Sequence, residues 1–313
     1  LHFAHEAEKL LPEEHAMTRS LVPFILCRIY RHRGELDRAE AYARENLKLS
    51  LQADNTWSLS GAVHELIWIC RLRGRLNEAA ETLLAYDHVF ASNKDMGPIA
   101  KIISVRGEIE RERGNLEEAA VFVERALHAA EGWGLPSDVC FCLHNLLRLE
   151  LSAGRPEQAL EAMNRIDEIT RASRVYSSIL PLYEAERARI FIGLGRGPEA
   201  LARLDSYNLP DEGEIINWEI IEIARARTFV ALGRSGEARE LTSRIARDAA
   251  EGKRRGRLLQ ILVLEAASGF IRRVLGKRIE LRHLPTLNFI YDNSLTRANR
   301  IENILKEIKT EEK

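Results

Sequence analysis

The stretch that decides the fold is "GELDRAE", residues 34–40, because it recurs along the chain at an almost constant interval. Close copies are "GRLNEAA" from Gly74, "GNLEEAA" from Gly114 and "GRPEQAL" from Gly154, and weaker copies are "GRGPEAL" from Gly195 and "GRSGEAR" from Gly233. Successive glycines are separated by 40, 40, 40, 41 and 38 residues. A period of this size is typical of a solenoid of repeated structural units.

The residue types within the phrase explain why one helix ends there and another begins. Glycine takes the left-handed conformation that ends a helix, and the polar and acidic residues after it suit the first turn of the next helix. A small alanine at the fifth or sixth position after the glycine lets the two helices pack closely. We therefore predict a turn between paired antiparallel helices at each of six glycines: Gly34, Gly74, Gly114, Gly154, Gly195 and Gly233.

The two helices of each predicted pair differ in their apolar pattern. The second carries a narrow stripe at steps of three and four, as in Leu36, Ala39, Ala43 and Leu47. The first is more apolar, as in "SLVPFILCRIYRHRG" (20–34), so it should be covered on several sides. The predicted fold is therefore an all-α superhelix of hairpins resembling tetratricopeptide repeats (TPRs), with a concave groove that would bind a small effector or a protein.

Residues 1–266 resemble the repeat domain of the MalT-like, LuxR-type ATP-dependent transcription regulators. The resemblance rests on the long period, on turns such as "RGNLEEAA" (113–120) and on "RRGRLLQILVLEAA" (254–267). It implies a sensor domain that follows a nucleotide-binding domain and precedes a DNA-reading helix-turn-helix. The chain has no GxxxxGK[ST] phosphate loop and no recognisable helix-turn-helix, so ATPase activity and direct DNA binding do not carry over.

The segment "ASGFIRRVLGKRIELRHLPTLNFIYDNSLTRANRIENILKEI", 267–308, does not continue the repeat. It resembles the C-terminal half of ribosome-binding factor A, an RNA-binding protein of the KH type. The resemblance implies a KH-like kink at Ala267, Ser268 and Gly269. It also implies RNA contacts from Lys277, Arg278 and Arg282, with 16S ribosomal RNA or the 30S subunit as the partner.

The chain is thus predicted to divide into a TPR-like domain, 1–266, and a ribosome-binding factor A-like fragment, 267–313. "TLNFIYD" (286–292) alternates like a strand, but the helical repeats upstream offer it no sheet partner. We expect it to be extended and unpaired or captured as helix, followed by an amphipathic helix over 294–308. The join could be a natural fusion, an engineered chimera or a faulty gene assembly, and an artificial or accidental join is favoured.

Charge and cysteine usage set broad limits. The net charge of -1 gives no general argument for binding nucleic acid or membrane, although residues 270–313 carry +4 and the rest -5. Cys27, Cys70, Cys140 and Cys142 lie in apolar helical runs without a disulfide framework, which indicates a reducing cytoplasm. The chain begins at Leu1 within a helical pattern, so we expect it to be part of a longer protein.

The possible metal motif is C-x-C-x-H, formed by Cys140, Cys142 and His144. Helical spacing places Cys140 and His144 on one face and Cys142 elsewhere, whereas zinc requires four ligands. We expect two buried cysteines, a partly exposed histidine and no metal. The tryptophans could line a groove, but core packing or loop anchoring is favoured for each of Trp57, Trp68, Trp133 and Trp218.

The charged clusters give no catalytic set. Glu108, Glu110 and Glu112 alternate around a helix and are expected to converge on nothing. A second cluster is expected to lie in a solvated loop and consists of Lys253, Arg254, Arg255 and Arg257. We therefore predict no enzyme and no cofactor. The leading hypothesis is an effector- or partner-binding sensor module of a transcription regulator. The alternatives are an RNA-binding protein of small-subunit ribosome maturation and a general TPR scaffold for proteins.

Overall fold

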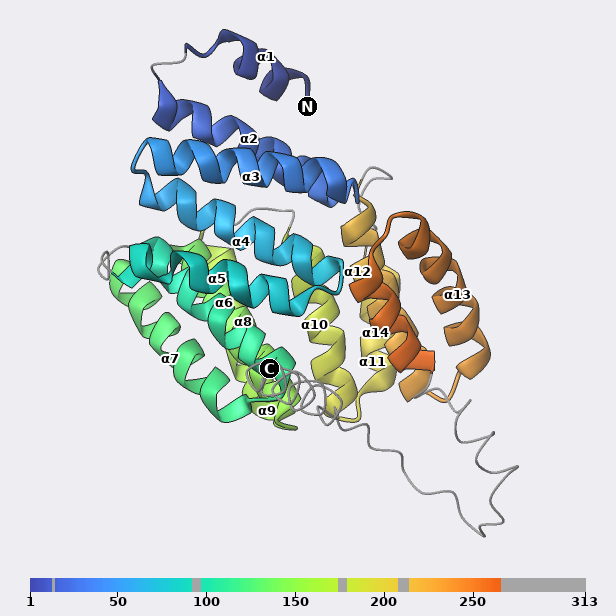
Figure 1. The fold of residues 1–313 in the computed structure, drawn as a ribbon. Coiled ribbons are helices and arrows are strands. Elements are labelled where there is room, and N and C mark those ends of the chain that lie inside the picture. The colour runs from blue at the N-terminus through green and yellow to red at the C-terminus, as the bar shows by residue number, and fades with distance from the viewer. Residues whose placement is uncertain (13–14, 92–96, 174–178, 208–213, 266–313) are drawn as a thin grey trace, which may run out of the picture. The chain divides into compact units, whose positions relative to one another are not determined.

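The computed structural model describes residues 1–12, 15–91, 97–173, 179–207 and 214–265 (Figure 1). The chain divides by its internal contacts into two units, Leu1–Ile271 and Arg272–Lys313. The predicted kink at 267–269, the strand at 286–292, the final helix and the candidate RNA contacts Lys277, Arg278 and Arg282 all lie outside the described residues.

The described residues form fourteen helices and no strand, which confirms the all-helical prediction for this part of the chain. The helices are α1 (His2–Leu10), α2 (Ala16–His32), α3 (Leu36–Gln52), α4 (Thr56–Leu72), α5 (Leu76–Ala91), α6 (Gly97–Arg113), α7 (Leu116–Trp133), α8 (Pro136–Ser152), α9 (Pro156–Ala172), α10 (Leu180–Gly193), α11 (Gly197–Ser206), α12 (Ile215–Ala231), α13 (Ser235–Glu251) and α14 (Arg255–Glu265). None of these helices is long and apolar enough to cross a membrane.

The repeated phrase forms the turn within each helix pair, from α2–α3 to α12–α13. The six glycines that open the phrase have φ between +72° and +85°. In each turn the next residue donates its N–H to the carbonyl five residues earlier; Asn115, for example, donates to Glu110 at 2.9 Å. This bond closes the Schellman motif that ends a helix. The alanine five residues after each glycine is buried at Ala39, Ala79, Ala119, Ala159, Ala200 and Ala238.

The helices form two layers. The first helices of adjacent pairs contact one another from α2 through α4, α6, α8 and α10, and α10 contacts α12, which in turn contacts α14. We call these seven the inner helices. The outer helices are α3, α5, α7, α9, α11 and α13, and each contacts the inner helices before and after it in the chain. Burial follows this division: α3 buries one stripe of residues, whereas α12 buries residues on most of its circumference.

The last inner helices contact the first ones. Helix α12 contacts α2, and α14 contacts α4. Leu36 and Leu72 share a hydrophobic cluster with Ile216 and Ile220, although about 150 to 180 residues separate them in sequence. Helix α14 also packs on α13, so it stands in the place of the first helix of a seventh pair.

The contact between α14 and α4 is close at the backbone level. A Cβ atom at Gly256 would lie 2.1 Å from the carbonyl oxygen of Arg71 and 3.0 Å from that of Leu72. Because neither neighbour is a flexible side chain, only glycine fits at this position without a shift of the backbone. Nearby, Lys253 pairs with Asp37 of α3 at 3.3 Å.

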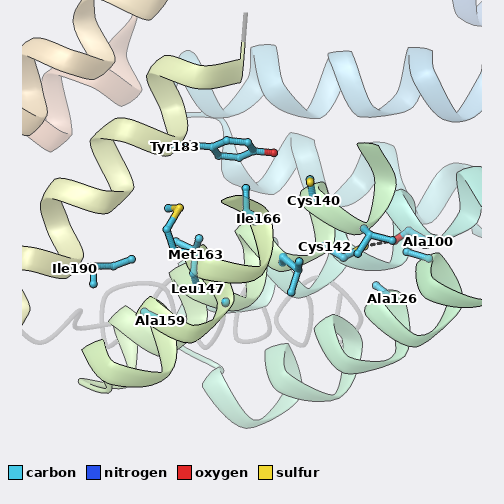
Figure 2. Close-up of a cluster of buried hydrophobic side chains, with 14 residues drawn as sticks. Ala100, Ala126, Cys140, Cys142, Leu147, Ala159, Met163, Ile166, Tyr183 and Ile190 are labelled. Atoms are coloured by element: carbon cyan, nitrogen blue, oxygen red, sulfur yellow. Dashed lines mark hydrogen bonds between the residues drawn. The ribbon is translucent and has the colours of Figure 1, made fainter. Parts of the chain in front are cut away.

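The central core lies between inner and outer helices and includes two of the four cysteines (Figure 2). Cys140 and Cys142 of α8 are fully buried, and the Cys142 thiol lies 4.0 Å from the carbonyl oxygen of Ala100. Burial raises the pKa of Cys140 to about 11 and that of Cys142 to about 12. Cys27 and Cys70 are also buried and free, so the cysteines fill space in the core.

Candidate ligand-binding face of the inner helices

One repeated position on the inner helices carries a charged side chain in five of six repeats. Six residues before the turn glycines the chain has Arg28, Trp68, Glu108, Arg148, Arg189 and Arg227. Three residues before the first three glycines stand Arg31, Arg71 and Arg111. Positions three apart lie on the same side of a helix. Because successive inner helices contact one another, this register brings charged side chains from different repeats together.

Glu108 of α6 joins three inner helices. Its side chain is 3% exposed and accepts hydrogen bonds from Arg71 of α4 at 2.7 Å and from Arg111 at 2.9 Å. It also accepts one from Arg148 of α8. Burial alone would raise the pKa of Glu108, but these three guanidinium groups hold it well below its ordinary value. Glu108 is therefore an ionised group at the centre of a buried ion network.

Glu112 lies one helical turn farther along α6 and binds Arg71 at 2.5 Å. The expectation that the glutamates of this helix converge on nothing is therefore wrong for Glu108 and Glu112, although Glu110 turns away to Asn115. The partners Arg71 and Arg148 lie 37 and 40 residues from Glu108 in the sequence. Inspection of one helix could not find them, whereas comparison of successive repeats could.

Glu186 extends the network to α10. It binds Arg189 at 2.6 Å, and its other oxygen lies 3.4 Å from Nε of Arg148 and 3.9 Å from Nε2 of His144. Burial opposes ionisation, but Arg189, Arg148 and His144 lower the pKa of Glu186 to about 2. Arg148 thus contacts both Glu108 and Glu186, and the network runs without interruption from α4 to α10.

Glu219 of α12 holds the beginning of α14. It accepts a hydrogen bond from Nε of Arg254 at 2.9 Å and lies 3.4 Å from Nε of Arg257. Arg254 is only 2% exposed, so the prediction that residues 253–257 form a solvated basic loop is wrong at this position. The local sequence shows four cations side by side, whereas the carboxylate that binds Arg254 belongs to Glu219, 35 residues earlier.

The buried carboxylates of the inner helices hold arginines that differ in exposure. Glu65, Glu108, Glu186 and Glu219 are all buried. Of their arginine partners, Arg31 and Arg254 are buried as well. Arg71, Arg148 and Arg189 are partly exposed, up to 26% for the Arg189 side chain. The buried carboxylates therefore orient a set of partly exposed guanidinium groups, each a planar donor suited to phosphate or carboxylate.

The C-x-C-x-H motif of α8 is buried. Cys140, Cys142 and His144 are all buried, so the expectation of a partly exposed histidine is wrong. His144 is 4% exposed and packs 5.9 Å from the Tyr183 ring. Desolvation lowers its pKa to about 4, although Glu186 opposes this shift. Among the described residues no group of His, Cys, Asp and Glu side chains could hold a metal ion.

The four tryptophans occupy different environments. Trp57 and Trp133 are each 50% exposed at helix ends and do not fill the core. Trp218 packs against a hydrophobic cluster, with Arg244 5.3 Å from its ring centre. Trp68 lies at the repeated inner position, with the Arg31 guanidinium 4.3 Å from its ring centre. Of these four tryptophans, Trp68 is therefore the one that occupies the same repeat position as the charged residues of the network.

Comparison with known families separates the chain into two overlapping regions. The profile described as "MalT-like TPR region" matches residues 1–269. The profile described as "Ribosome-binding factor A" matches residues 246–305. This second match begins earlier than the resemblance at 267–308 and includes the end of α13 and all of α14.

Curated proteins named ribosome-binding factor A match the C-terminal part of the chain. Ribosome-binding factor A of Geobacter sulfurreducens is 50% identical over 48 residues, which are 15% of this chain and 41% of that protein. The protein of the same name from Pelobacter propionicus is 52% identical over 48 residues, covering 15% and 39%. That of Thermodesulfovibrio yellowstonii is 40% identical over 57 residues, covering 18% and 48%. The chain spans less than half the length of these relatives.

Proposed function

Because the chain belongs to the family of MalT-like TPR regions, we propose that it is the sensor module of a LuxR-type transcription regulator. Its inner helices would bind a small effector or a protein partner. The observation that carries this proposal is the set of partly exposed arginines, held by buried carboxylates on consecutive inner helices. Such groups are ordered before a ligand arrives, which lowers the entropy lost on binding.

The arrangement of the helices gives a ligand a means of acting at a distance. Helices α12 and α14 contact α2 and α4, so the first and last pairs of the array are in direct contact. A ligand that binds one arrangement of the inner helices more tightly than another would shift the balance between them. A neighbouring domain could then respond to the state of this contact.

A thermal-shift screen of metabolites against the full chain tests the sensor proposal. An effector should raise the melting temperature of the wild type in a concentration-dependent way. The rise should be lost in Arg189→Gln on the inner face and kept in Arg165→Gln, a matched change on outer helix α9, where Arg165 pairs with Glu131. A screen without a hit, or equal loss in both variants, would contradict the proposal.

A second candidate function is binding of small-subunit ribosomal RNA through residues 267–313, proposed as a separate fragment. The identity of 50% over 48 residues to ribosome-binding factor A favours it. The candidate contacts are Lys277, Arg278 and Arg282. Filter binding to 16S ribosomal RNA should weaken when all three are changed to Glu. Absence of binding by the unchanged chain would refute this candidate. If the metabolite screen fails as well, a general TPR scaffold for protein partners is the remaining hypothesis.

A further inference from the structure

Arg227 of α12 differs from the other arginines at the repeated inner position of α8 and α10. It makes no hydrogen bond or ion pair with any residue in the described part of the chain. It is partly exposed, and it lies six residues before Gly233, in register with Arg189 and Arg148. Burial, with the neighbouring cations Arg189, Arg257 and Arg148, lowers its pKa to about 9 against the opposing effect of Glu186. Arg227 therefore remains charged at neutral pH.

The carboxylates near Arg227 already form ion pairs with other arginines. Glu186 is held by Arg189 and Arg148, and Glu219 by Arg254 and Arg257. Glu222, on the same helix as Arg227, binds Arg244 at 2.7 Å and Arg225 at 3.2 Å. None of these carboxylates lies within ion-pair distance of Arg227 in the described structure.

The connected network carries excess positive charge. Within the described residues it contains the carboxylates of Glu108, Glu112 and Glu186. Facing them are the guanidinium groups of Arg71, Arg111, Arg148 and Arg189, and Arg227, unpaired in the described part of the chain, adds a fifth positive charge beside the network without joining it. Two positive charges are therefore uncompensated in a partly buried setting. Unpaired like charges at low dielectric are unfavourable, and a bound anion would remove this cost.

We propose that Arg227, with Arg189 and Arg148, binds a small dianionic ligand that carries a phosphate group or paired carboxylates. The inference rests on the proposed sensor function and gives the effector its chemical class. The three arginines stand at one register on α8, α10 and α12, and Glu186 orients two of them. Guanidinium groups bind such anions through paired N–H donors. The three helices that carry these arginines contact one another in series, so the three side chains suit a small anion.

Arg225 provides a matched control on the same helix. It lies two residues before Arg227, so it points to a different side of α12. Its guanidinium binds Asp205 at 2.6 Å and Glu222 at 3.2 Å. Arg225→Gln removes the same charge from the same helix without touching the proposed site. It therefore separates a specific contact from a general loss of positive charge.

The test is calorimetric titration of the full chain with inorganic pyrophosphate, inorganic phosphate and citrate at fixed ionic strength. Wild type should bind pyrophosphate or citrate. Arg227→Gln should weaken this binding about tenfold or more, which corresponds to loss of one charge-assisted contact. Arg225→Gln should bind like wild type, and Arg227→Lys should bind with intermediate affinity. Preference for pyrophosphate over citrate would identify phosphate as the recognised group.

Melting temperatures of the wild type and of Arg227→Gln show whether weaker binding results from a loss of folding. Because Arg227 faces like charges, Arg227→Gln should be at least as stable as wild type without anion. Pyrophosphate should stabilise wild type more than it stabilises Arg227→Gln. Unchanged anion binding in Arg227→Gln would overturn the inference, as would binding of 16S ribosomal RNA that depends on Arg227. If no anion binds but a neutral effector stabilises the chain, this inference fails while the sensor function stands. If nothing binds, both fail.

Discussion

At the scale of single residues, two kinds of position define this chain. The turn glycines fix the hairpins through backbone conformation, and the buried glutamates of the inner helices fix the arginines through charge. Gly114 shows the first kind clearly, because its φ is +85° and a Cβ atom there would meet nothing within 4 Å. Any penalty for replacing it is therefore a backbone penalty alone.

Gly114→Val should lower the free energy of unfolding by about 1 kcal/mol or more, because L-residues with a branched side chain disfavour the left-handed conformation. Gly114→Asn should cost less, since asparagine tolerates that conformation. Denaturant unfolding of both variants measures the difference. Equal stability of the valine variant and the wild type would show that this turn does not depend on positive φ.

His144 makes stability depend on pH. Its pKa is about 4 when folded against an ordinary value of 6.5, so the unfolded chain binds a proton in this window and the folded chain does not. The free energy of unfolding should therefore fall as the pH drops from 6.5 to 4, by up to about 3 kcal/mol from this group. Unfolding followed across this range should show a smaller loss for His144→Gln.

The exposed His128 is the matched control for this measurement. His128→Gln should leave the pH dependence as it is in the wild type. If His144→Gln and wild type lose the same stability between pH 6.5 and 4, His144 does not stay neutral in the folded chain.

At the scale of helices, the contact of α14 with α4 is the feature that repetition alone does not imply. Gly256 allows it, because a side chain there would meet the backbone carbonyls of Arg71 and Leu72. Arg254 supports it from the side, through the buried Glu219. The beginning of α14 therefore combines a steric and an electrostatic requirement within three residues.

Gly256→Ala should destabilise the array by about 1 to 3 kcal/mol, as overpacking does in other cores. The matched control is Gly236→Ala in α13, where a Cβ atom meets nothing within 4 Å. That change should leave stability equal or slightly higher, because alanine favours helix. Thermal unfolding distinguishes the two variants. A Gly256→Ala protein as stable as wild type would mean that α14 and α4 are not in close contact.

The sequence was sufficient to predict the hairpins but not the network. Gly34 and its five equivalents are local signals, since the residues that form each turn lie within the repeated phrase. Glu108 has partners from the repeats before and after it, and an alternating row of glutamates on one helix gives no sign of them. Arg254 looked like part of a solvated basic loop because its partner, Glu219, precedes it by a whole hairpin. Aligning the repeats by their glycines would have revealed the recurrent inner position.

At the scale of the whole molecule, the chain combines a repeat array with a C-terminal region that matches a second family profile. The family profiles overlap at residues 246–269, which include α14. The described hydrophobic clusters are built from residues up to Leu264, so the helical pairs have their cores within the array. In solenoids, stability comes mostly from contacts between neighbouring repeats.

Deletion of residues 270–313 should therefore leave the array folded, with helical circular dichroism and a melting temperature close to those of the full chain. We also expect higher solubility, because the deletion removes the apolar segment 286–292, for which the sequence offers no sheet partner. Unfolding of the truncated chain would show that the C-terminal segment is an integrated cap, and the idea of an accidental join would then be wrong.

Hydrogen–deuterium exchange of the full chain, with and without inorganic pyrophosphate, tests most directly the central claim that the inner helices form the ligand-binding face. The account predicts slower exchange in α8, α10 and α12 when the anion is present, and little change in α9, α11 and α13. It also predicts that Arg227→Gln weakens this protection at a given anion concentration while Arg225→Gln keeps it. Protection confined to the outer helices, or equal exchange with and without the anion, would contradict the account.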